Sequence, residues 1–210
     1  SEGFFCGPCG DMVRPYDGPR CGVCGRHFPD GSGSGHTCYD CTKKPPVFEA
    51  ARAKLAYDGP VREAIRLYKY GRIRKLRSYL GGFMEDGARD WFPDSDVVCA
   101  VPLHRRRLRD RGFNQSLFLA ESAALAVGAR LSLDGLARVR YTAPQVGMGH
   151  AERLANVKGA FEVARPGEFA GARVLLVDDV YTTGATVNEC ARVLMKAGAA
   201  SVRVLTVARA

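Results

Sequence analysis

The 210-residue sequence contains no run of about 18 or more consecutive apolar residues, so it offers no candidate for a membrane-spanning helix. Its first residues also lack the basic segment followed by an apolar segment that marks a secretory signal. These two absences predict a cytoplasmic protein without a membrane span. The initial methionine is missing as well. We therefore expect a processed chain or a fragment whose natural start lies upstream.

Lysine is also scarce, because it accounts for only seven of the 31 basic residues that produce a net charge of +9. Arginine presents a planar fork that matches phosphate oxygens, so an arginine-rich surface favours a polyphosphate ligand or nucleic acid. A genome that prefers arginine codons would produce the same composition. The net charge by itself therefore does not decide the function.

The composition changes near Pro45 and divides the chain into two parts. Residues 1–45 are rich in Gly, Pro, Asp and Ser and contain six of the eight cysteines, so this part is too polar to fold without a cross-link. Residues 46–210 contain apolar patterns that can build one substantial core. We expect a small cysteine-rich module over 1–45 and one larger domain over 46–210.

The six cysteines of the first part form three Cys-x-x-Cys pairs, which predict a zinc module. A disulfide framework or a redox pair explains three repeats in a polar segment less well. One structural zinc ion takes four ligands, and our preferred set is Cys21, Cys24, Cys38 and Cys41. Cys6 and Cys9 would then form a second site with an upstream pair. The alternative is a single site made by the first two pairs.

Four further residues are weaker candidates for metal binding. His27 and His36 lie near the cysteine pairs and could replace a cysteine, but we expect exposed loop histidines. Cys99 lies in an apolar run and Cys190 in a predicted helix. Both are expected to be buried as small hydrophobic residues.

The most informative stretch is residues 174–186, Val-Leu-Leu-Val-Asp-Asp-Val-Tyr-Thr-Thr-Gly-Ala-Thr. Its apolar beginning predicts a strand buried on both faces of a parallel sheet. Asp178 and Asp179 follow, and their carboxylates can accept hydrogen bonds from vicinal ribose hydroxyls. The next residues predict a turn that opens a helix, where backbone N–H groups and the helix dipole hold a phosphate. The residues of this turn are Thr182, Thr183, Gly184, Ala185 and Thr186.

A second charged loop follows another apolar run. Residues 97–101 predict a second buried strand, and five arginines fall within the seven residues 105–111. A helix is expected over 116–127. The arginines place a positive field at a strand end, where a pyrophosphate would lie. The favoured pyrophosphate ligands are Arg111 with its neighbours Gly112 and Asn114, followed by Arg105.

Two predicted helices, at 61–70 and 76–91, would form a hood beside the sheet. Lys69 in the first helix could touch a substrate, but a solvated helix face is the expected position of this lysine. Residues 138–156 have little apolar periodicity and predict a mobile loop. Arg153 and Asn156 are the candidates for a ligand contact within this loop.

Residues 174–186 resemble the phosphoribosyl pyrophosphate (PRPP) signature of type I phosphoribosyltransferases, in which two acidic residues precede a Thr-Thr-Gly-x-Thr loop. Together with residues 101–116, 142–145 and 153–157, this stretch resembles the ComF family of competence-associated proteins, also known as GntX. That family joins an N-terminal zinc module to a phosphoribosyltransferase-like domain and is linked to DNA uptake. Its members commonly have a further Cys-x-x-Cys pair before those found here, so the start of this chain departs from the pattern.

The resemblance implies an α/β fold in which a type I phosphoribosyltransferase-like parallel-sheet domain with flanking helices follows a small zinc-ribbon or zinc-knuckle module. It implies that Asp178 and Asp179 meet the ribose hydroxyls of PRPP and that residues 182–186 wrap its 5′-phosphate. The loop that contains Arg153 would close over the pyrophosphate and exclude water. PRPP would bind with Mg²⁺, and an acceptor that the sequence does not identify would displace the pyrophosphate. The catalytic residues would be Asp178, Asp179 and Arg153.

Two other functions remain open at this point. The protein could bind PRPP as a non-catalytic sensor or scaffold that acts in DNA uptake through its zinc module and DNA-uptake proteins. Its basic surface could also bind single-stranded DNA directly, although the aromatic residues available for base stacking form no repeated pattern.

Overall fold

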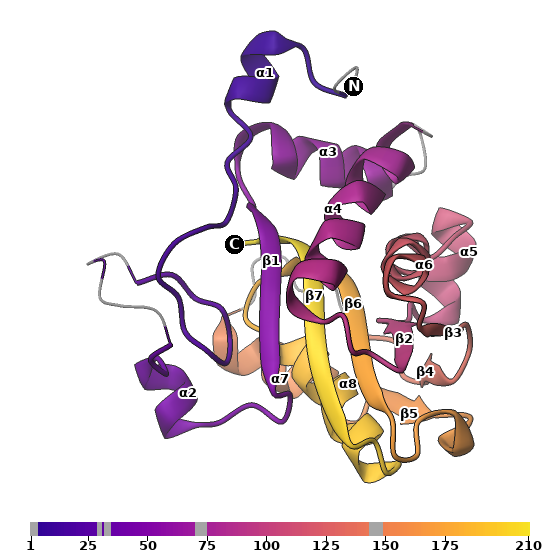
Figure 1. Ribbon diagram of the computed structural model, residues 1–210. Coiled ribbons are helices and arrows are strands. Elements are labelled where there is room, and N and C mark those ends of the chain that lie inside the picture. The colour runs from indigo at the N-terminus through magenta and orange to yellow at the C-terminus, as the bar shows by residue number, and fades with distance from the viewer. Residues whose placement is uncertain (1–3, 29–30, 32–34, 70–74, 143–148) are drawn as a thin grey trace.

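The computed structural model describes residues 4–28, 31, 35–69, 75–142 and 149–210. Its central feature is a five-stranded parallel sheet (Figure 1). The strands of this sheet are β1 (Ala50–Ala56), β2 (Val97–Ala100), β3 (Arg130–Ser132), β6 (Arg173–Tyr181) and β7 (Ser201–Arg209). They lie in the order β1-β7-β6-β2-β3. A short antiparallel ribbon joins β4 (Leu136–Arg138) to β5 (Phe161–Val163).

Helices cover both faces of the sheet (Figure 1). One face packs against α3 (Gly59–Lys69), α4 (Lys75–Trp91) and α6 (Gln115–Val127). The other face packs against α7 (His150–Val157) and α8 (Ala185–Lys196). The shorter helices are α1 (Gly7–Asp11), α2 (Tyr39–Lys43), α5 (Arg105–Arg111) and the 3₁₀ turn η1 (Pro166–Glu168). Among the described residues, no helix is long and apolar enough to cross a membrane.

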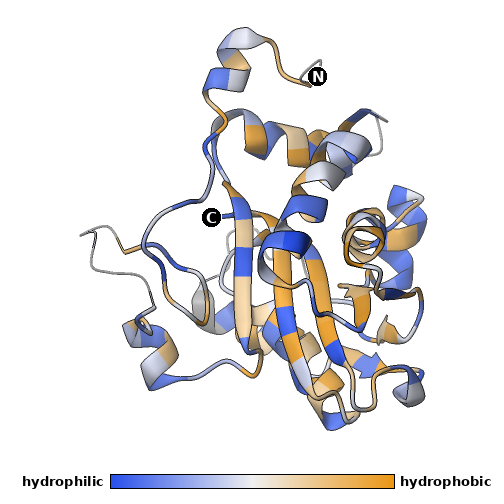
Figure 2. Cartoon of the chain, in the orientation of Figure 1, coloured by the Kyte–Doolittle hydropathy of each residue, from blue (hydrophilic) through white to orange (hydrophobic). Residues whose placement is uncertain are grey.

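The core explains why the central strands have continuous apolar sequences. In β6, Leu175 and Val177 face α4 and α6, whereas Val174 and Leu176 face α8, and all four are fully buried. Figure 2 shows the same apolar character along β6 and β7. Because successive strand residues point to opposite faces, a strand covered on both sides needs apolar residues at every position.

Most predicted elements are confirmed, with two clear differences. The arginine-rich stretch expected as a loop at 105–111 is the helix α5, and a helix also lies in the loop expected at 138–156. The helices expected at 76–91 and 116–127 are α4 and α6, and α3 matches the first predicted helix as far as Lys69. The expected loop at 138–156 instead contains α7. This helix begins where the Gly149 backbone N–H donates to Glu152 Oε2 at 2.8 Å, and Leu154 and Val157 pack into the core from its face. Eight residues are too few to show a helical period in the sequence.

The connections that follow β6 and β2 cover opposite faces of the sheet. The chain passes from β6 to β7 through α8, on one face, and from β2 to β3 through α5 and then α6, which covers the other face. In open α/β sheets, ligands bind outside the carboxyl ends of strands at such a topological switch point. The acid pair lies near the carboxyl end of β6, and α5 follows β2. The fold therefore brings the two charged stretches predicted from the sequence to one crevice.

The N-terminal segment lies along the edge strand β1 (Figure 1). The backbone N–H of Tyr16 donates to the carbonyl of Lys54 at 2.8 Å, and that of Ala51 donates to the carbonyl of Val23 at 2.7 Å. The four cysteines of the preferred metal site are buried in the same apolar cluster as the α8 side of the sheet. The cysteine-rich segment is therefore fixed against the sheet.

Candidate functional site

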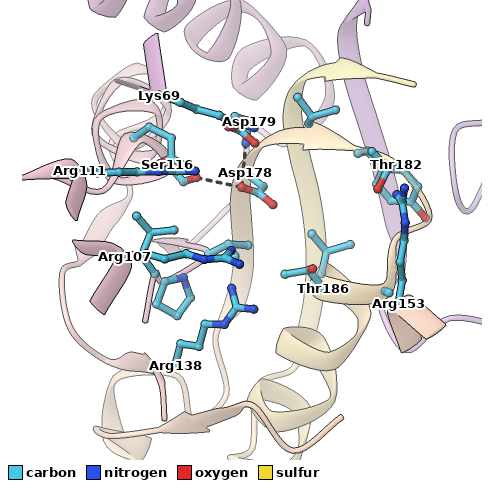
Figure 3. A pocket seen from close by; sticks show the side chains of 18 of the residues that line it. Lys69, Arg107, Arg111, Ser116, Arg138, Arg153, Asp178, Asp179, Thr182 and Thr186 are labelled. Atoms are coloured by element: carbon cyan, nitrogen blue, oxygen red, sulfur yellow. Dashed lines mark hydrogen bonds and ion pairs between the residues drawn. The ribbon is translucent and has the colours of Figure 1, made fainter. Parts of the chain in front are cut away.

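A cleft of about 790 Å³ opens at the carboxyl end of the sheet, where β6 meets the segment after β2 (Figure 3). Residues from both predicted charged stretches line it, together with Lys69 of α3 and Arg138 of β4. Its charged lining residues are Lys69, Arg107, Arg111, Arg138, Arg153, Asp110, Asp178 and Asp179. This lining suits a ligand that carries both anionic groups and hydroxyl donors.

The two carboxylates of the acid pair have different surroundings. Asp178 Oδ1 accepts hydrogen bonds from Ser116 Oγ and from the Asp179 backbone N–H, each at 2.9 Å. Burial and then the neighbouring Asp179 raise the pKa of Asp178 to about 7. The Asp179 carboxylate is buried, and its Oδ2 lies 2.9 Å from Lys69 Nζ. Hydroxyl donors from a ligand would stabilise the ionised form of Asp178.

Lys69 lines the cleft, although the sequence favoured a solvated helix face. It is the last residue of α3, and the preceding Tyr68 is buried and donates its hydroxyl to the carbonyl of Gln115 at 2.9 Å. This contact holds the end of α3 against the start of α6. Burial lowers the pKa of Lys69, but the ion pair with Asp179 outweighs it and keeps the pKa above its ordinary value.

The turn between β6 and α8, residues 182–186, has the geometry expected of a phosphate-binding loop, and we call it the phosphate-type loop. Gly184 has a φ of +76°, and a Cβ at this position would lie 2.2 Å from the Tyr181 hydroxyl, so glycine is required. Thr183 Oγ1 accepts a hydrogen bond from the backbone N–H of Ala185 at 3.4 Å, at the start of α8. The turn residues that line the cleft are Thr182, Gly184, Ala185 and Thr186. The positive end of the α8 dipole therefore faces the cleft.

The arginines of α5 point in different directions. Arg107 and Arg111 line the cleft, whereas Arg105 lines a separate, largely apolar hollow. Arg107 Nη2 donates to the carbonyl of Thr142 at 3.1 Å, and Arg111 Nη1 donates to Gln115 Oε1 at 3.0 Å. Of the two arginines that the sequence favoured, the structure places Arg111 in the cleft and Arg105 outside it.

Gly112 and Asn114 shape the connection between α5 and α6. Gly112 ends α5 with a φ of +78°. Asn114 begins α6, because its Oδ1 accepts a hydrogen bond from the Ser116 backbone N–H and its Nδ2 donates to the carbonyl of Val101, each at 3.2 Å. Neither Gly112 nor Asn114 is among the residues that line the cleft. Their contacts instead place Ser116 where it reaches Asp178.

Arg138, at the end of β4, lines the cleft, although no sequence motif indicated it. It is only 9% exposed, donates to the Thr142 hydroxyl and lies 5.2 Å from the centre of the Phe161 ring. Burial, followed by nearby Arg107, lowers the pKa of Arg138. Within the described part of the chain, Arg107, Arg111 and Arg138 form no ion pair with a carboxylate. An anionic ligand would compensate for this unmatched charge.

Helix α7 supplies the two residues predicted for the loop over the cleft. Arg153 lines the cleft (Figure 3). The helix α7 packs against α8. Asn156 is not a lining residue, and its carbonyl accepts a hydrogen bond from Arg140 Nη2 at 3.0 Å. Residues 143–148, which include most of the motif at 142–145, lie outside the described residues.

A second candidate site is the cluster of buried cysteines beside β1. Its members are the preferred four, Cys21, Cys24, Cys38 and Cys41. Their Sγ atoms all lie within 4.8 Å of one another, and those of Cys24 and Cys38 are 3.7 Å apart. A tetrahedral zinc ion with bonds of about 2.3 Å separates its sulfur ligands by about 3.8 Å. The backbone N–H of Cys38 also donates to Cys21 Sγ at 3.3 Å, a contact that stabilises a thiolate. The cluster therefore fits a structural metal ion.

The sequence offers six other cysteines and histidines as weaker candidates for metal binding: Cys6, Cys9, Cys99, Cys190, His27 and His36. None belongs to a group of three or more metal-binding side chains within the described residues. Cys6 caps the first turn of α1, in which Cys9 lies, and Cys6 is exposed. Cys99 and Cys190 are buried, as expected from their apolar surroundings.

Comparison with known proteins gives consistent matches. The family model of the phosphoribosyl transferase domain matches residues 114–210. The DNA utilization protein YhgH of Salmonella typhi is 31% identical, and the match covers 98% of this chain and 90% of the relative. Competence protein F of Haemophilus influenzae is 28% identical with the same coverage. A solved structure of glutamine PRPP amidotransferase from B. subtilis, complexed with ADP and GMP, is 25% identical with a TM-score of 0.47, and covers 67% of this chain and 30% of that chain.

Taken together, the family model and the curated relatives match both the cysteine-rich segment and the larger domain. The domain match contains β6, the phosphate-type loop, α8 and β7, and the match to the curated relatives also includes the cysteine cluster. The parallel sheet with helices on both faces is the type I phosphoribosyltransferase fold. The chain belongs to the ComF family of competence proteins and joins a phosphoribosyltransferase-type domain to a cysteine cluster that can hold a metal ion.

Proposed function

We propose that this protein binds PRPP with Mg²⁺ in the cleft and transfers its phosphoribosyl group to an acceptor, with release of pyrophosphate. One observation carries the proposal: the cleft combines a carboxylate pair, a phosphate-type loop and arginines that form no ion pair with a described carboxylate. A matching ligand needs vicinal hydroxyls, one phosphate and a separate polyphosphate. PRPP carries all three groups on one ribose.

Each part of the cleft would contact one part of PRPP. Asp178 and Asp179 would accept hydrogen bonds from the ribose hydroxyls, and the turn at 182–186 would hold the 5′-phosphate with the N-terminus of α8. Carboxylate and pyrophosphate oxygens are the ligands that Mg²⁺ prefers. The cations that would face the pyrophosphate are Arg107, Arg111, Arg138 and Arg153. Arg105, Gly112 and Asn114 would act indirectly, through the placement of α5 and α6.

The reaction that fits this arrangement is direct displacement at the anomeric carbon. The acceptor forms a bond to C1′ and loses a proton, while the C1′–O bond breaks and the pyrophosphate leaves with the electron pair. Negative charge grows on the pyrophosphate, which the arginines would stabilise, and positive charge grows on the ribose, which Asp178 and Asp179 would stabilise. The proposed catalysis is therefore mainly electrostatic.

We also propose Zn²⁺ as the occupant of the cysteine cluster, where it would fix residues 1–45 as a module against the phosphoribosyltransferase-type domain of residues 46–210. The relatives carry the names DNA utilization protein and competence protein. We extend a role in DNA uptake and use to this chain, and place its action in the cytoplasm.

Isothermal titration of the zinc-loaded protein with PRPP and Mg²⁺ tests the binding step. Replacing both carboxylates, in Asp178→Asn/Asp179→Asn, should weaken binding more than about 100-fold, because each charge-assisted hydrogen bond contributes about 1.5–3 kcal/mol. The matched control is Asp90→Asn, which changes an exposed aspartate paired with Lys54 and should bind normally. Absence of PRPP binding to the wild-type protein, or normal binding by the double variant, would refute the proposal.

A second assay separates transfer from binding alone. The protein is incubated with PRPP, Mg²⁺ and a panel of bases, amines and nucleotides, and the released pyrophosphate is measured. Release that depends on a particular acceptor supports a transferase. Tight PRPP binding without release for any acceptor would instead support a non-catalytic PRPP sensor or scaffold in DNA uptake.

A further inference from the structure

The cysteine cluster and the phosphate-type loop are connected through Arg209, the last residue of β7. Arg209 is 6% exposed, and its Nη1 donates to the carbonyl of Cys24 at 2.5 Å. Its Nη2 lies 3.9 Å from Cys24 Sγ, and its guanidinium carbon lies 4.2 Å from the centre of the Tyr181 ring. One buried guanidinium thus contacts both a predicted metal ligand and an aromatic residue of the cleft.

Tyr181 continues this connection to the loop. It is the last residue of β6, pairs with Arg209 across the sheet and lines the cleft. Its hydroxyl lies so close to Gly184 that no Cβ fits between them. The position of the Tyr181 ring therefore constrains the turn at which the 5′-phosphate would bind.

A second, independent connection runs from the segment after the last cysteine of the cluster. The backbone N–H of Val47 donates to Asn188 Oδ1, in the first turns of α8, at 2.7 Å. The next residue, Phe48, is buried and packs edge to face on Tyr181, with ring centres 6.3 Å apart. The chain that leaves Cys41 therefore contacts both the helix and the tyrosine that shape the loop.

We propose that Arg209 and Tyr181 are positioning residues that make the affinity for PRPP depend on the metal ion in the cysteine cluster. The inference rests on the proposed PRPP binding. A bound metal ion cross-links the polar segment from Cys21 to Cys41 and fixes the Cys24 carbonyl that Arg209 contacts. Without that cross-link, Arg209 loses a fixed acceptor, and Tyr181 and the turn lose their support.

Thermodynamic linkage makes this proposal measurable without an activity assay. If the metal ion raises the affinity for PRPP by a given factor, PRPP must raise the affinity for the metal ion by the same factor. We expect a factor of about ten, within the range typical of coupled sites. If Arg209 had only a structural role, Arg209→Met would change the retention of the metal ion equally with and without PRPP.

The experiment measures zinc transfer from the full chain to a chromogenic chelator at equilibrium, with and without saturating PRPP and Mg²⁺. An equimolar mixture of ribose 5-phosphate and pyrophosphate controls for direct binding of zinc by phosphate groups. Wild-type protein should retain zinc about tenfold more strongly with PRPP. Arg209→Met should lose this dependence. The control Arg192→Met changes an exposed arginine of α8 that pairs with Glu189, and should keep it.

Tyr181→Phe provides a second test should Arg209→Met fail to fold, because it keeps the ring beside Arg209 and removes the hydroxyl beside Gly184. This variant should retain zinc normally without PRPP and show a reduced PRPP effect. Equal zinc retention with and without PRPP, in wild-type protein that binds PRPP by titration calorimetry, would overturn the inference and leave the proposed function intact. If wild-type protein does not bind PRPP, both are refuted.

Discussion

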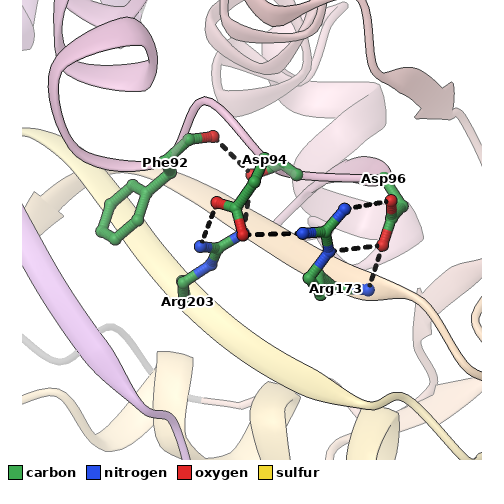
Figure 4. Close-up of polar contacts among 6 residues, drawn as sticks. Phe92, Asp94, Asp96, Arg173 and Arg203 are labelled. Carbon is green, nitrogen blue, oxygen red and sulfur yellow. Dashed lines mark hydrogen bonds and ion pairs between the residues drawn. The ribbon is translucent and has the colours of Figure 1, made fainter.

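The two ends of the central sheet use charge in opposite ways. At the amino end, charges are matched (Figure 4). Arg173 donates to Asp94 and Asp96 at 2.8 Å, and the buried Arg203 donates to Asp94 Oδ1 at 2.6 Å and to Ser95 Oγ at 3.3 Å. Hydrogen bonds from Arg173 hold the pKa of Asp96 well below its usual range. This network joins the starts of β2, β6 and β7.

At the carboxyl end, three arginines of the cleft have no carboxylate partner among the described residues. Arg107, Arg111 and Arg138 donate to neutral acceptors within the described residues, and Asp178 has a raised pKa. Lys69 and Asp179, by contrast, form an ion pair in the cleft. This contrast supports our proposal that charges at the amino end stabilise the fold, whereas those of the cleft bind an anionic ligand. Variants at the two ends should therefore separate stability from binding.

The largest loss of stability is expected from Arg203→Met at the amino end. The arginine side chain is only 10% exposed, and its removal leaves Asp94 and Ser95 without this donor. The free energy of unfolding, measured in urea, should fall by about 3 kcal/mol. PRPP affinity of the folded protein should not change. A parallel loss of PRPP affinity would contradict the division between the two ends.

Lys69→Met tests the ion pair between Lys69 and Asp179 in the cleft. It leaves the buried Asp179 carboxylate without its cation, and the free energy of unfolding should fall by about 2 kcal/mol. Adding Asp179→Asn to this variant should restore most of the loss, because the carboxylate that lost its cation is then removed as well. Equal stability of wild-type and Lys69→Met proteins would show that the ion pair does not hold α3 over the cleft.

Arg138→Met should have the opposite effects to Arg203→Met, because it should lower the affinity for PRPP and leave the stability nearly unchanged. Its guanidinium is buried and has no carboxylate partner among the described residues, so the free energy of unfolding should change by less than about 1 kcal/mol. PRPP affinity should fall about tenfold, which corresponds to about 1.4 kcal/mol, because one charged contact to the pyrophosphate is lost. Titration calorimetry and urea unfolding of the same preparation check both values. A stability loss as large as that of Arg203→Met would place Arg138 with the structural charges.

The titration of Asp178 is expected to change the free energy of unfolding gradually with pH. Its pKa of about 7 lies above the ordinary value of aspartic acid, so between these values the folded protein keeps a proton that the unfolded chain has released. The stability that this residue contributes should fall as the pH rises from about 4 to about 7. Urea unfolding at several pH values should show this slope in the wild-type protein and not in Asp178→Asn. Parallel pH profiles would contradict the raised pKa.

The part of the site that the sequence predicted is contiguous. A strand, two carboxylates, a glycine turn and a helix follow one another within residues 174–186, so local pattern is enough to identify them. The sequence also placed an arginine-rich segment after β2. It could not tell which arginines face the cleft, because successive helix residues point in different directions. Arg107 and Arg111 are four residues apart and share a face, whereas Arg105 does not share it.

The sequence offered Lys69 only as a weak candidate and did not indicate Arg138 or Ser116, because the positions of these residues depend on contacts between distant elements. Lys69 ends a helix and resembles a solvated lysine until α3 is placed over the end of β6. Arg138 belongs to a three-residue strand that is too short to show a period. Ser116 reaches Asp178 only because α6 starts beside the neighbouring strand. Such contacts follow from strand order, which no local pattern encodes.

A comparison of two ligands that differ only in pyrophosphate shows whether the cleft recognises PRPP through its arginines. Titration calorimetry measures the affinities for PRPP with Mg²⁺ and for ribose 5-phosphate with Mg²⁺, in the wild-type protein and in Arg107→Met/Arg138→Met. If the unmatched arginines bind pyrophosphate, wild-type protein should prefer PRPP by more than about 100-fold, and the variant should lose most of that preference. Equal affinities for the two ligands in the wild-type protein would contradict the account.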